Sequence, residues 1–135
     1  MMMNQMKHQN FKIELSGKVI HGDSYGKILG FPTANLDRRE YVRKKMKIRL
    51  GVWAGRVRID ANNKLYKAGI TIGLLDKKGL IKIEAYLIGF QGNLYGQKIN
   101  LYFDKYLRPL KRFKNADALK SQVEKDIIII KKIIK

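Results

Sequence analysis

The sequence predicts a mainly β fold: a small antiparallel barrel or sheet closed by a C-terminal helix. Three observations support this prediction. Apolar and polar residues alternate through the central part of the chain, which is typical of strands with one buried face. Turn signals separate these segments at short intervals, and this spacing favours an antiparallel meander over β–α–β units. The C-terminal residues then change to the period of an amphipathic helix.

Five segments show the alternation expected of strands. In the first, Phe11–Ile20, apolar side chains stand at Phe11, Ile13 and Leu15. The turn signals DANN, DKKG and QGN separate the later segments, because Asn, Asp and Gly tolerate turn conformations. These later strands are expected at Gly51–Ile59, Lys64–Gly73, Leu80–Phe90 and Tyr95–Phe103.

The last element is predicted to be a helix over about residues 116–134. Its apolar residues recur with spacings of 4, 4, 3 and 4, which places them on one helical face: Leu119, Val123, Ile127, Ile130 and Ile134. Asn115 or Asp117 can cap the start. The strands would form a barrel over about residues 11–108, and the whole chain, 1–135, a single domain.

The composition excludes several classes of protein. The chain has 135 residues, of which 45% are hydrophobic, enough for a buried core. It has no cysteine, so it has no disulfide framework and no thiolate chemistry. Its first residues lack the apolar core of a signal peptide, and the longest aliphatic run, Ile127–Ile130, is too short to cross a bilayer. We expect a soluble cytoplasmic protein, a monomer, with no membrane partner.

The chain is strongly basic, with 29 Lys and Arg against 11 Asp and Glu and a formal net charge of +18. A field of this sign attracts nucleic acid, nucleotides or anionic membrane. However, the positive charges are spread along the chain and do not form one block. We therefore expect no nucleic-acid partner, and keep a basic β-barrel that binds nucleic acid as an alternative.

The segment between Asn35 and Gly51 is rich in basic residues and shows no clear period. The simplest interpretation is a solvated loop or a short helix. A functional interpretation is a mobile basic flap over an anionic ligand.

A glycine-rich stretch, Gly22–Ile28, looks at first like a phosphate-binding P-loop. A P-loop has a longer spacing between its glycines, and a Ser or Thr directly after the lysine. Here Gly22 and Gly26 are too close, and Ile28 follows Lys27. The glycines still permit backbone N–H groups to turn toward an anion, and Lys27 supplies a positive charge. On spacing alone, an ordinary turn is the better interpretation.

The stretch Gly30–Leu36, GFPTANL, is more informative. Pro32 has a fixed φ and no N–H, so it sets a rigid entry to the segment. Thr33 and Asn35 are two residues apart, and in an extended segment both side chains lie on one face. A hydroxyl and a carboxamide oxygen side by side can bind a hard cation such as Mg²⁺. The alternative is that they only satisfy backbone groups in a turn.

Taken together, these motifs resemble the riboflavin kinase (flavokinase) family, whose members make FMN from riboflavin and ATP. Gly17–Leu36 is similar to the opening signature of the family. Four further blocks resemble the family in the same order, at Gly51–Trp53, Ile83–Phe103, Leu107–Phe113 and Ala118–Ile127. The resemblance implies a six-stranded antiparallel Greek-key barrel with a terminal helix. It also implies riboflavin/FMN and ATP/ADP as ligands, with Mg²⁺ or another divalent cation.

The resemblance also implies roles for single residues. The metal and the nucleotide phosphates would be held by Thr33 and Asn35. Further nucleotide contacts would be made by Gly22, Gly26, Lys27, Leu87, Gly89 and Tyr95. The flavin would be contacted by Arg108, Lys111 and Phe113.

Glu84 matches the catalytic base of the family. Phosphoryl transfer depends mostly on positioning and charge neutralisation, but a carboxylate must accept the proton of the attacking ribityl hydroxyl. In IKIEAYLI the apolar residues share one face, and Glu84 lies on the other face between Lys82 and Tyr86. Alone, it would be interpreted as a surface carboxylate paired with a lysine. The ordered motifs favour the catalytic role.

The chain departs from the family pattern in places. After Gly73 it has LLDKKG in place of an Asn-Pro-containing turn, and Asp37–Leu50, which corresponds to a mobile loop over the ligands, lacks the usual proline-containing end. Leu110 stands where some members carry an acidic residue. A second hypothesis is therefore a flavin- or nucleotide-binding relative without catalysis. Only about ten residues precede the first strand, so we expect no FAD synthesis.

Overall fold

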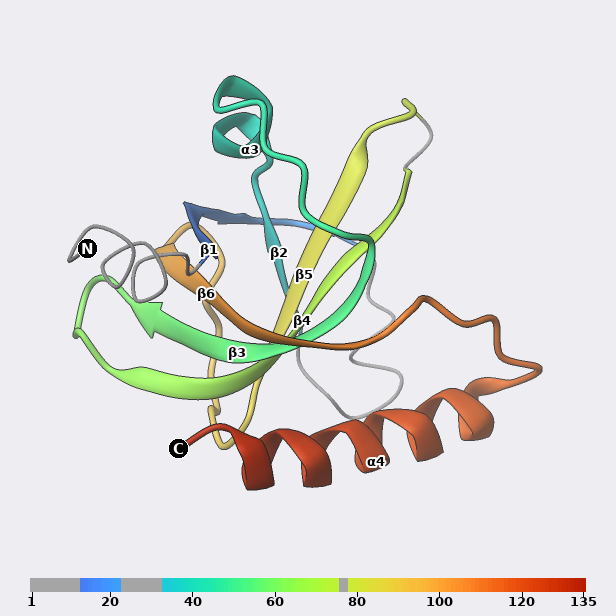
Figure 1. Cartoon of the computed structure of the whole chain (residues 1–135). Coiled ribbons are helices and arrows are strands. Elements are labelled where there is room, and N and C mark those ends of the chain that lie inside the picture. The colour runs from blue at the N-terminus through green and yellow to red at the C-terminus, as the bar shows by residue number, and fades with distance from the viewer. Residues whose placement is uncertain (1–12, 23–32, 76–77) are drawn as a thin grey trace, which may run out of the picture.

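The strands in the described part of the chain close into a six-stranded antiparallel barrel (Figure 1). The computed structural model describes residues 13–22, 33–75 and 78–135. The order around the barrel is β1-β2-β5-β4-β3-β6, which confirms the predicted fold class. The strands are β1 (Ile13–Ile20), β2 (Thr33–Leu36), β3 (Gly51–Ile59), β4 (Leu65–Leu75), β5 (Ile81–Leu87) and β6 (Lys98–Arg108).

The strand boundaries between residues 80 and 108 differ from the predicted ones. β5 ends at Leu87, and β6 begins only at Lys98 and continues to Arg108. Two glycines explain the shorter β5 and the late start of β6. Gly89 and Gly96 have φ of +85° and +81°, a left-handed conformation that turns the chain and that glycine adopts without a steric penalty.

The barrel interior is filled by alternate side chains of the strands. Strand β2 shows the alternation most clearly: Ala34 and Leu36 are buried in the core, while Thr33 and Asn35 between them are half-buried. Thr33 and Asn35 therefore lie on the outer face, as predicted for an extended segment. The other strands contribute, among others, Leu15, Val19, Val57, Ile59, Ile70, Ile72, Ile83, Ile99 and Leu101.

Helix α4 (Ala116–Ile133) packs on the outside of the barrel (Figure 1). Asn115 caps it, because its side-chain oxygen accepts a hydrogen bond from the Ala118 N–H at 2.8 Å. The apolar face predicted from the spacing is the face that packs. Ile130 and Ile134 are buried against Ala54 and Tyr86 of the barrel wall.

A buried ion pair fastens α4 to the end of β6. The Asp126 side chain is 2% exposed, and its Oδ2 lies 2.7 Å from Nη2 of Arg108. Arg108 Nε lies 3.1 Å from the other carboxylate oxygen, and Gln122 Nε2 donates to that oxygen at 3.0 Å. This bidentate ion pair combines charge attraction with fixed geometry. It therefore determines the position of α4 on the barrel as well as stabilising its packing there.

The basic segment after β2 contains a short helix, α3 (Arg39–Arg43). It is anchored to the core, because Tyr41 and Ile48 are both buried. The Tyr41 hydroxyl accepts a hydrogen bond from the Ile48 N–H at 3.1 Å. Glu40 forms ion pairs with Arg43 and Lys44, so its carboxylate offsets part of the positive charge of this basic segment.

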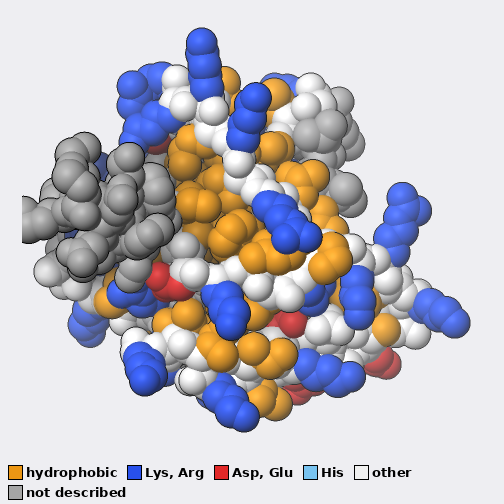
Figure 2. Space-filling view, in the orientation of Figure 1, with side chains coloured by type: hydrophobic (Ala, Val, Ile, Leu, Met, Phe, Trp, Pro, Cys, Tyr) orange, Lys and Arg blue, Asp and Glu red, His pale blue; other side chains and the backbone are white. Residues whose placement is uncertain are grey.

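On the face that Figure 2 shows, Lys and Arg side chains are scattered, with apolar surface between them. Neither helix of the described chain has the length and apolar character needed to cross a membrane.

Tyr86 is a buried polar residue beneath α4. Its ring lies across Gly69 of β4, where an added Cβ would come within 2.2 Å of the Tyr86 Cζ atom. Its hydroxyl has no hydrogen-bond partner among the described residues. Burial raises the pKa of Tyr86 above its ordinary value of 10.0, and the nearby Asp126 carboxylate raises it further.

We expect Asp126→Asn to lower the free energy of unfolding by about 3–5 kcal/mol, because it leaves the Arg108 guanidinium without its buried counter-charge. Glu124→Gln makes the same chemical change on the exposed side of α4 and should alter stability by less than about 0.5 kcal/mol. Urea denaturation measures both variants. Equal effects would show that the pair does not stabilise the docked helix.

We expect Tyr86→Phe to leave stability near neutral pH unchanged or slightly higher, because the lost hydroxyl has no described partner. The pKa of Tyr86 is raised in the folded state, so its hydroxyl ionises more readily in the unfolded state as the pH passes about 10. The wild type therefore loses stability above that pH. The advantage of Tyr86→Phe over the wild type should therefore be larger at about pH 11 than at about pH 7. Urea titrations at both pH values test this, and an equal difference at both would contradict it.

Candidate functional site

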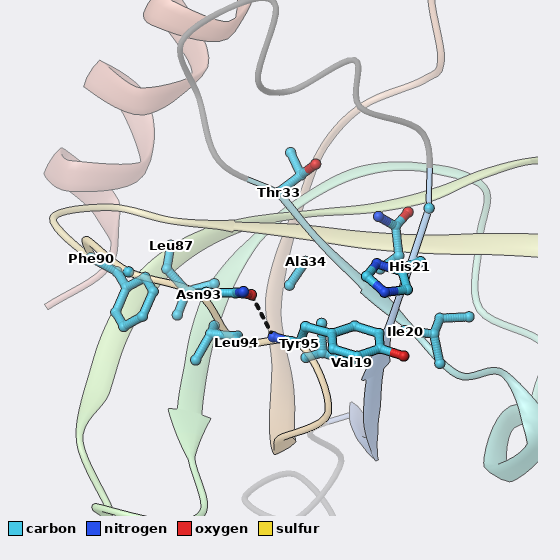
Figure 3. A pocket seen from close by; sticks show the side chains of 13 residues that line it. Val19, Ile20, His21, Thr33, Ala34, Leu87, Phe90, Asn93, Leu94 and Tyr95 are labelled. Atoms are coloured by element: carbon cyan, nitrogen blue, oxygen red, sulfur yellow. Dashed lines mark hydrogen bonds between the residues drawn. The ribbon is translucent and has the colours of Figure 1, made fainter.

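A cavity of about 390 Å³ lies at the end of the barrel where β1 and β5 end and β2 begins (Figure 3). This volume is in the range of small-molecule sites. Its walls combine the apolar edge of the core with polar groups on the outer face. The lining residues are Val19, Ile20, His21, Gly22, Thr33, Ala34, Asn35, Leu87, Phe90, Gly92, Asn93, Leu94 and Tyr95.

Most of the residues predicted to bind the nucleotide line this cavity. Those that line it are Gly22, Thr33, Asn35, Leu87 and Tyr95. Gly89 is absent from the lining; it lies in the exposed turn after β5. Gly26 and Lys27 lie outside the described residues.

An aromatic pair forms one wall of the cavity. The rings of His21 and Tyr95 are stacked, with centroids 3.6 Å apart and planes 18° from parallel (Figure 3). Asn93 fixes the turn beneath them, because its Oδ1 accepts a hydrogen bond from the Tyr95 N–H at 2.8 Å. A flat aromatic surface of this kind suits the stacking of a planar base.

Sequence reasoning named Tyr95 but missed His21, Phe90 and Asn93. His21 stands directly before Gly22 in the opening signature, so its place in the motif could have identified it. Phe90 and Asn93 belong to the connection between β5 and β6, part of which was predicted to be strand. Their contribution to the cavity depends on the turn at Gly89, whose conformation the pattern did not predict.

Pairing of β2 with β5 brings the predicted metal ligands next to the predicted base. Asn35 is the direct partner of Glu84, and Thr33 is the direct partner of Tyr86. Directly opposed residues on paired strands have their side chains on the same face. Thr33, Asn35 and Glu84 therefore share the outer face of the barrel.

Glu84 is a partly exposed carboxylate with one lysine beside it. Its side chain is 31% exposed, and its Oε1 lies 3.4 Å from the Lys82 Nζ atom. On the other side its direct strand partner is Thr71 of β4. Glu84 does not line the cavity itself; it adjoins the cavity through Asn35. A carboxylate in this position can accept a proton from a group bound beside the cavity.

The predicted flavin contacts lie apart from the cavity, at the end of β6 and in the connection to α4. Lys111 is exposed and Phe113 is half-buried. The Arg108 guanidinium is already engaged, because it pairs with Asp126 and its Nη1 donates to the Pro109 carbonyl at 3.3 Å. Arg108 thus holds this connection against α4. Whether it also contacts the flavin stays a prediction.

The residues present offer few ligands for a metal ion. In the described part of the chain no group of three His, Cys, Asp or Glu residues could hold a cation. Thr33 and Asn35 supply two neutral oxygens on one face of the cavity. Such a pair fits Mg²⁺, which commonly takes its other ligands from substrate phosphates and water.

Comparisons with known proteins cover most of the chain. The family model described as "Flavokinase: Riboflavin kinase" matches residues 9–134. A bifunctional riboflavin kinase/FMN adenylyltransferase of Buchnera aphidicola subsp. Schizaphis graminum is 36% identical over 121 residues, which is 87% of this chain and 38% of that protein. A protein of the same description from Listeria monocytogenes is 35% identical over 112 residues, 82% of this chain and 34% of that protein. The chain thus spans little more than a third of these relatives.

Two crystal structures share the fold. One, described as a macrolide-efflux protein from Streptococcus pneumoniae, superposes with a TM-score of 0.75 at 26% identity, covering 87% of this chain and 38% of that one. The other, riboflavin kinase from Trypanosoma brucei, superposes with a TM-score of 0.66 at 22% identity, covering 91% and 80% of the two chains. Because the family model extends over nearly the whole sequence, the chain belongs to the riboflavin kinase family.

Proposed function

We propose that this chain is a riboflavin kinase, which transfers the γ-phosphate of ATP to the ribityl 5′-hydroxyl of riboflavin and gives FMN and ADP. The observation that carries the proposal is the direct pairing of Asn35 with Glu84. It puts a predicted phosphate and metal ligand, at the edge of a cavity of suitable size, beside a carboxylate that can serve as a base. Family membership supports the same reaction.

The cavity is the proposed nucleotide site. The stacked His21 and Tyr95 rings would face the base, and Thr33 and Asn35 would face the phosphates. A divalent cation held by these two side chains would neutralise charge on the β- and γ-phosphates. The protein then contributes mainly by orientation, which is the larger part of catalysis in phosphoryl transfer.

Glu84 is the proposed general base. The ribityl oxygen forms a bond to the γ-phosphorus, the bond from that phosphorus to the β–γ bridging oxygen breaks, and ADP leaves. The hydroxyl proton passes to the Glu84 carboxylate. The Lys82 ammonium lies 3.4 Å from Glu84 Oε1, on the same strand and the same face of the barrel.

The proposed flavin side is the connection that follows β6. Lys111 offers a cation there, and Phe113 offers an aromatic surface. Arg108 holds this connection in place through its pair with Asp126, and its proposed flavin contact would be made from that position. The reacting hydroxyl must then reach Glu84 on the outer face of the barrel.

The first test is direct. The purified chain, given riboflavin and Mg-ATP, should form FMN and ADP in equal amounts, measured by chromatography. Addition of EDTA should reduce FMN to background, and excess Mg²⁺ should restore it, because the two neutral oxygens cannot offset the phosphate charge alone. Absence of FMN at every substrate concentration would contradict the proposal. Tight riboflavin binding without FMN would instead favour a relative that has lost catalysis.

The second test concerns the base. We expect Glu84→Gln to lower kcat by about 10²–10⁴-fold while nucleotide and riboflavin binding are kept, because the carboxamide fills the same space but cannot accept the proton. Glu14→Gln makes the same change at an exposed carboxylate of β1 and should leave kcat unchanged. Steady-state kinetics with binding measured by calorimetry separates the two effects. Unchanged kcat in Glu84→Gln would remove Glu84 as the base.

A further inference from the structure

The Asn35 side chain occupies the space that a side chain at position 22 would need. A Cβ atom built on Gly22 would lie 2.1 Å from Asn35 Cγ, 2.2 Å from its Nδ2 and 2.4 Å from its Oδ1. Ordinary contacts between such atoms are about 3.5–4.0 Å. The whole carboxamide therefore rests against the backbone of residue 22.

The requirement for glycine at position 22 is one of space. Gly22 is not among the residues with positive φ, so its backbone conformation is open to other amino acids. Gly89 shows the opposite case: its φ is +85°, and an added Cβ would meet nothing within 4 Å. Gly22 thus differs from the turn glycines of the chain, whose role is conformational.

We propose that Gly22 is a positioning residue for Asn35: the missing side chain lets the carboxamide lie against the end of β1 and so fixes its direction in the cavity. This inference rests on the proposed function, in which Asn35 serves the cation and the phosphates. It gives Gly22 a role distinct from donating its N–H to a phosphate.

The side chain of Asn35, and not the backbone, is the part that gives way when position 22 is filled. The Asn35 backbone is held from both sides, by Ile20 of β1 and by Glu84 of β5. The carboxamide turns about single bonds. A larger residue at position 22 therefore rotates the carboxamide away, and the barrel keeps its fold. A displacement of about 1 Å at a positioning group can cost about 100-fold in rate.

The experiment compares four proteins: wild type, Gly22→Ala, Asn35→Ala and the double variant. We expect Gly22→Ala to lower kcat/KM for ATP by about 10- to 100-fold. In the Asn35→Ala background, where the carboxamide is gone, the same change should lower kcat/KM by less than about threefold, since the two changes act on one contact. Gly73→Ala is the matched control, because its Cβ would meet its nearest neighbours at an ordinary 3.6 Å. It should behave as the wild type.

A second measurement does not depend on activity. The side-chain N–H₂ signal of Asn35, assigned in ¹⁵N-labelled protein by its loss in Asn35→Ala, should shift in Gly22→Ala and stay in place in Gly73→Ala. An unshifted signal would overturn the proposal, as would an equal loss of activity from Gly22→Ala in both backgrounds. If the wild type forms no FMN, the proposed function fails, and the signal still decides the contact.

The folding of the variants is informative as well. If Gly22→Ala does not fold, the double variant should fold as Asn35→Ala does, because the colliding group has been removed. Failure of the double variant, with Asn35→Ala folded, would show that residue 22 needs glycine for another reason and would overturn the proposal.

Discussion

The barrel closes through its shortest strand, and the site depends on that closure. β2 joins β1 to β5, and it can do so only with Ala34 and Leu36 turned into the core. Successive side chains of a strand point to opposite faces, so the residues that alternate with Ala34 and Leu36 must lie on the outer face. Thr33 and Asn35 are held on the outer face because their neighbours are buried. A shift of one residue would exchange the two sets, exposing core side chains and burying the polar ones.

The same pairing explains why the proposed nucleotide site and the proposed base form one unit. Asn35 stands between two strands, opposite Ile20 on one side and opposite Glu84 on the other. The cavity lies toward β1, where Gly22 gives the carboxamide its space. The carboxylate lies toward β5, with Lys82 beside it. Asn35 is therefore the residue through which the two halves of the proposed site contact each other.

The contact between helix α4 and the barrel contains a buried ion pair as well as apolar side chains. Ile130 and Ile134 pack on Tyr86 and Ala54, but the buried Asp126 must be matched by Arg108. Apolar packing would accept several helix positions, whereas a bidentate ion pair accepts few. The pair also fixes the beginning of the 109–115 connection, which carries Lys111 and Phe113. The position of the predicted flavin residues is thus linked to the docking of the helix.

Repeating patterns in the sequence predict five of the six described strands, helix α4, and the common face of Thr33 and Asn35. The cap of α4 was open between Asn115 and Asp117, and the structure assigns it to Asn115. The strands, the helix and the shared face follow from periodicity, which each segment carries locally. The contacts between distant residues come from the folded structure: Asn35 beside Glu84, Arg108 on Asp126, His21 stacked on Tyr95. Strand register and turn conformation set these contacts, and neither can be read from a periodic pattern. The glycines show the difference, since the sequence does not distinguish Gly89, which turns the chain, from Gly22, which makes room for Asn35.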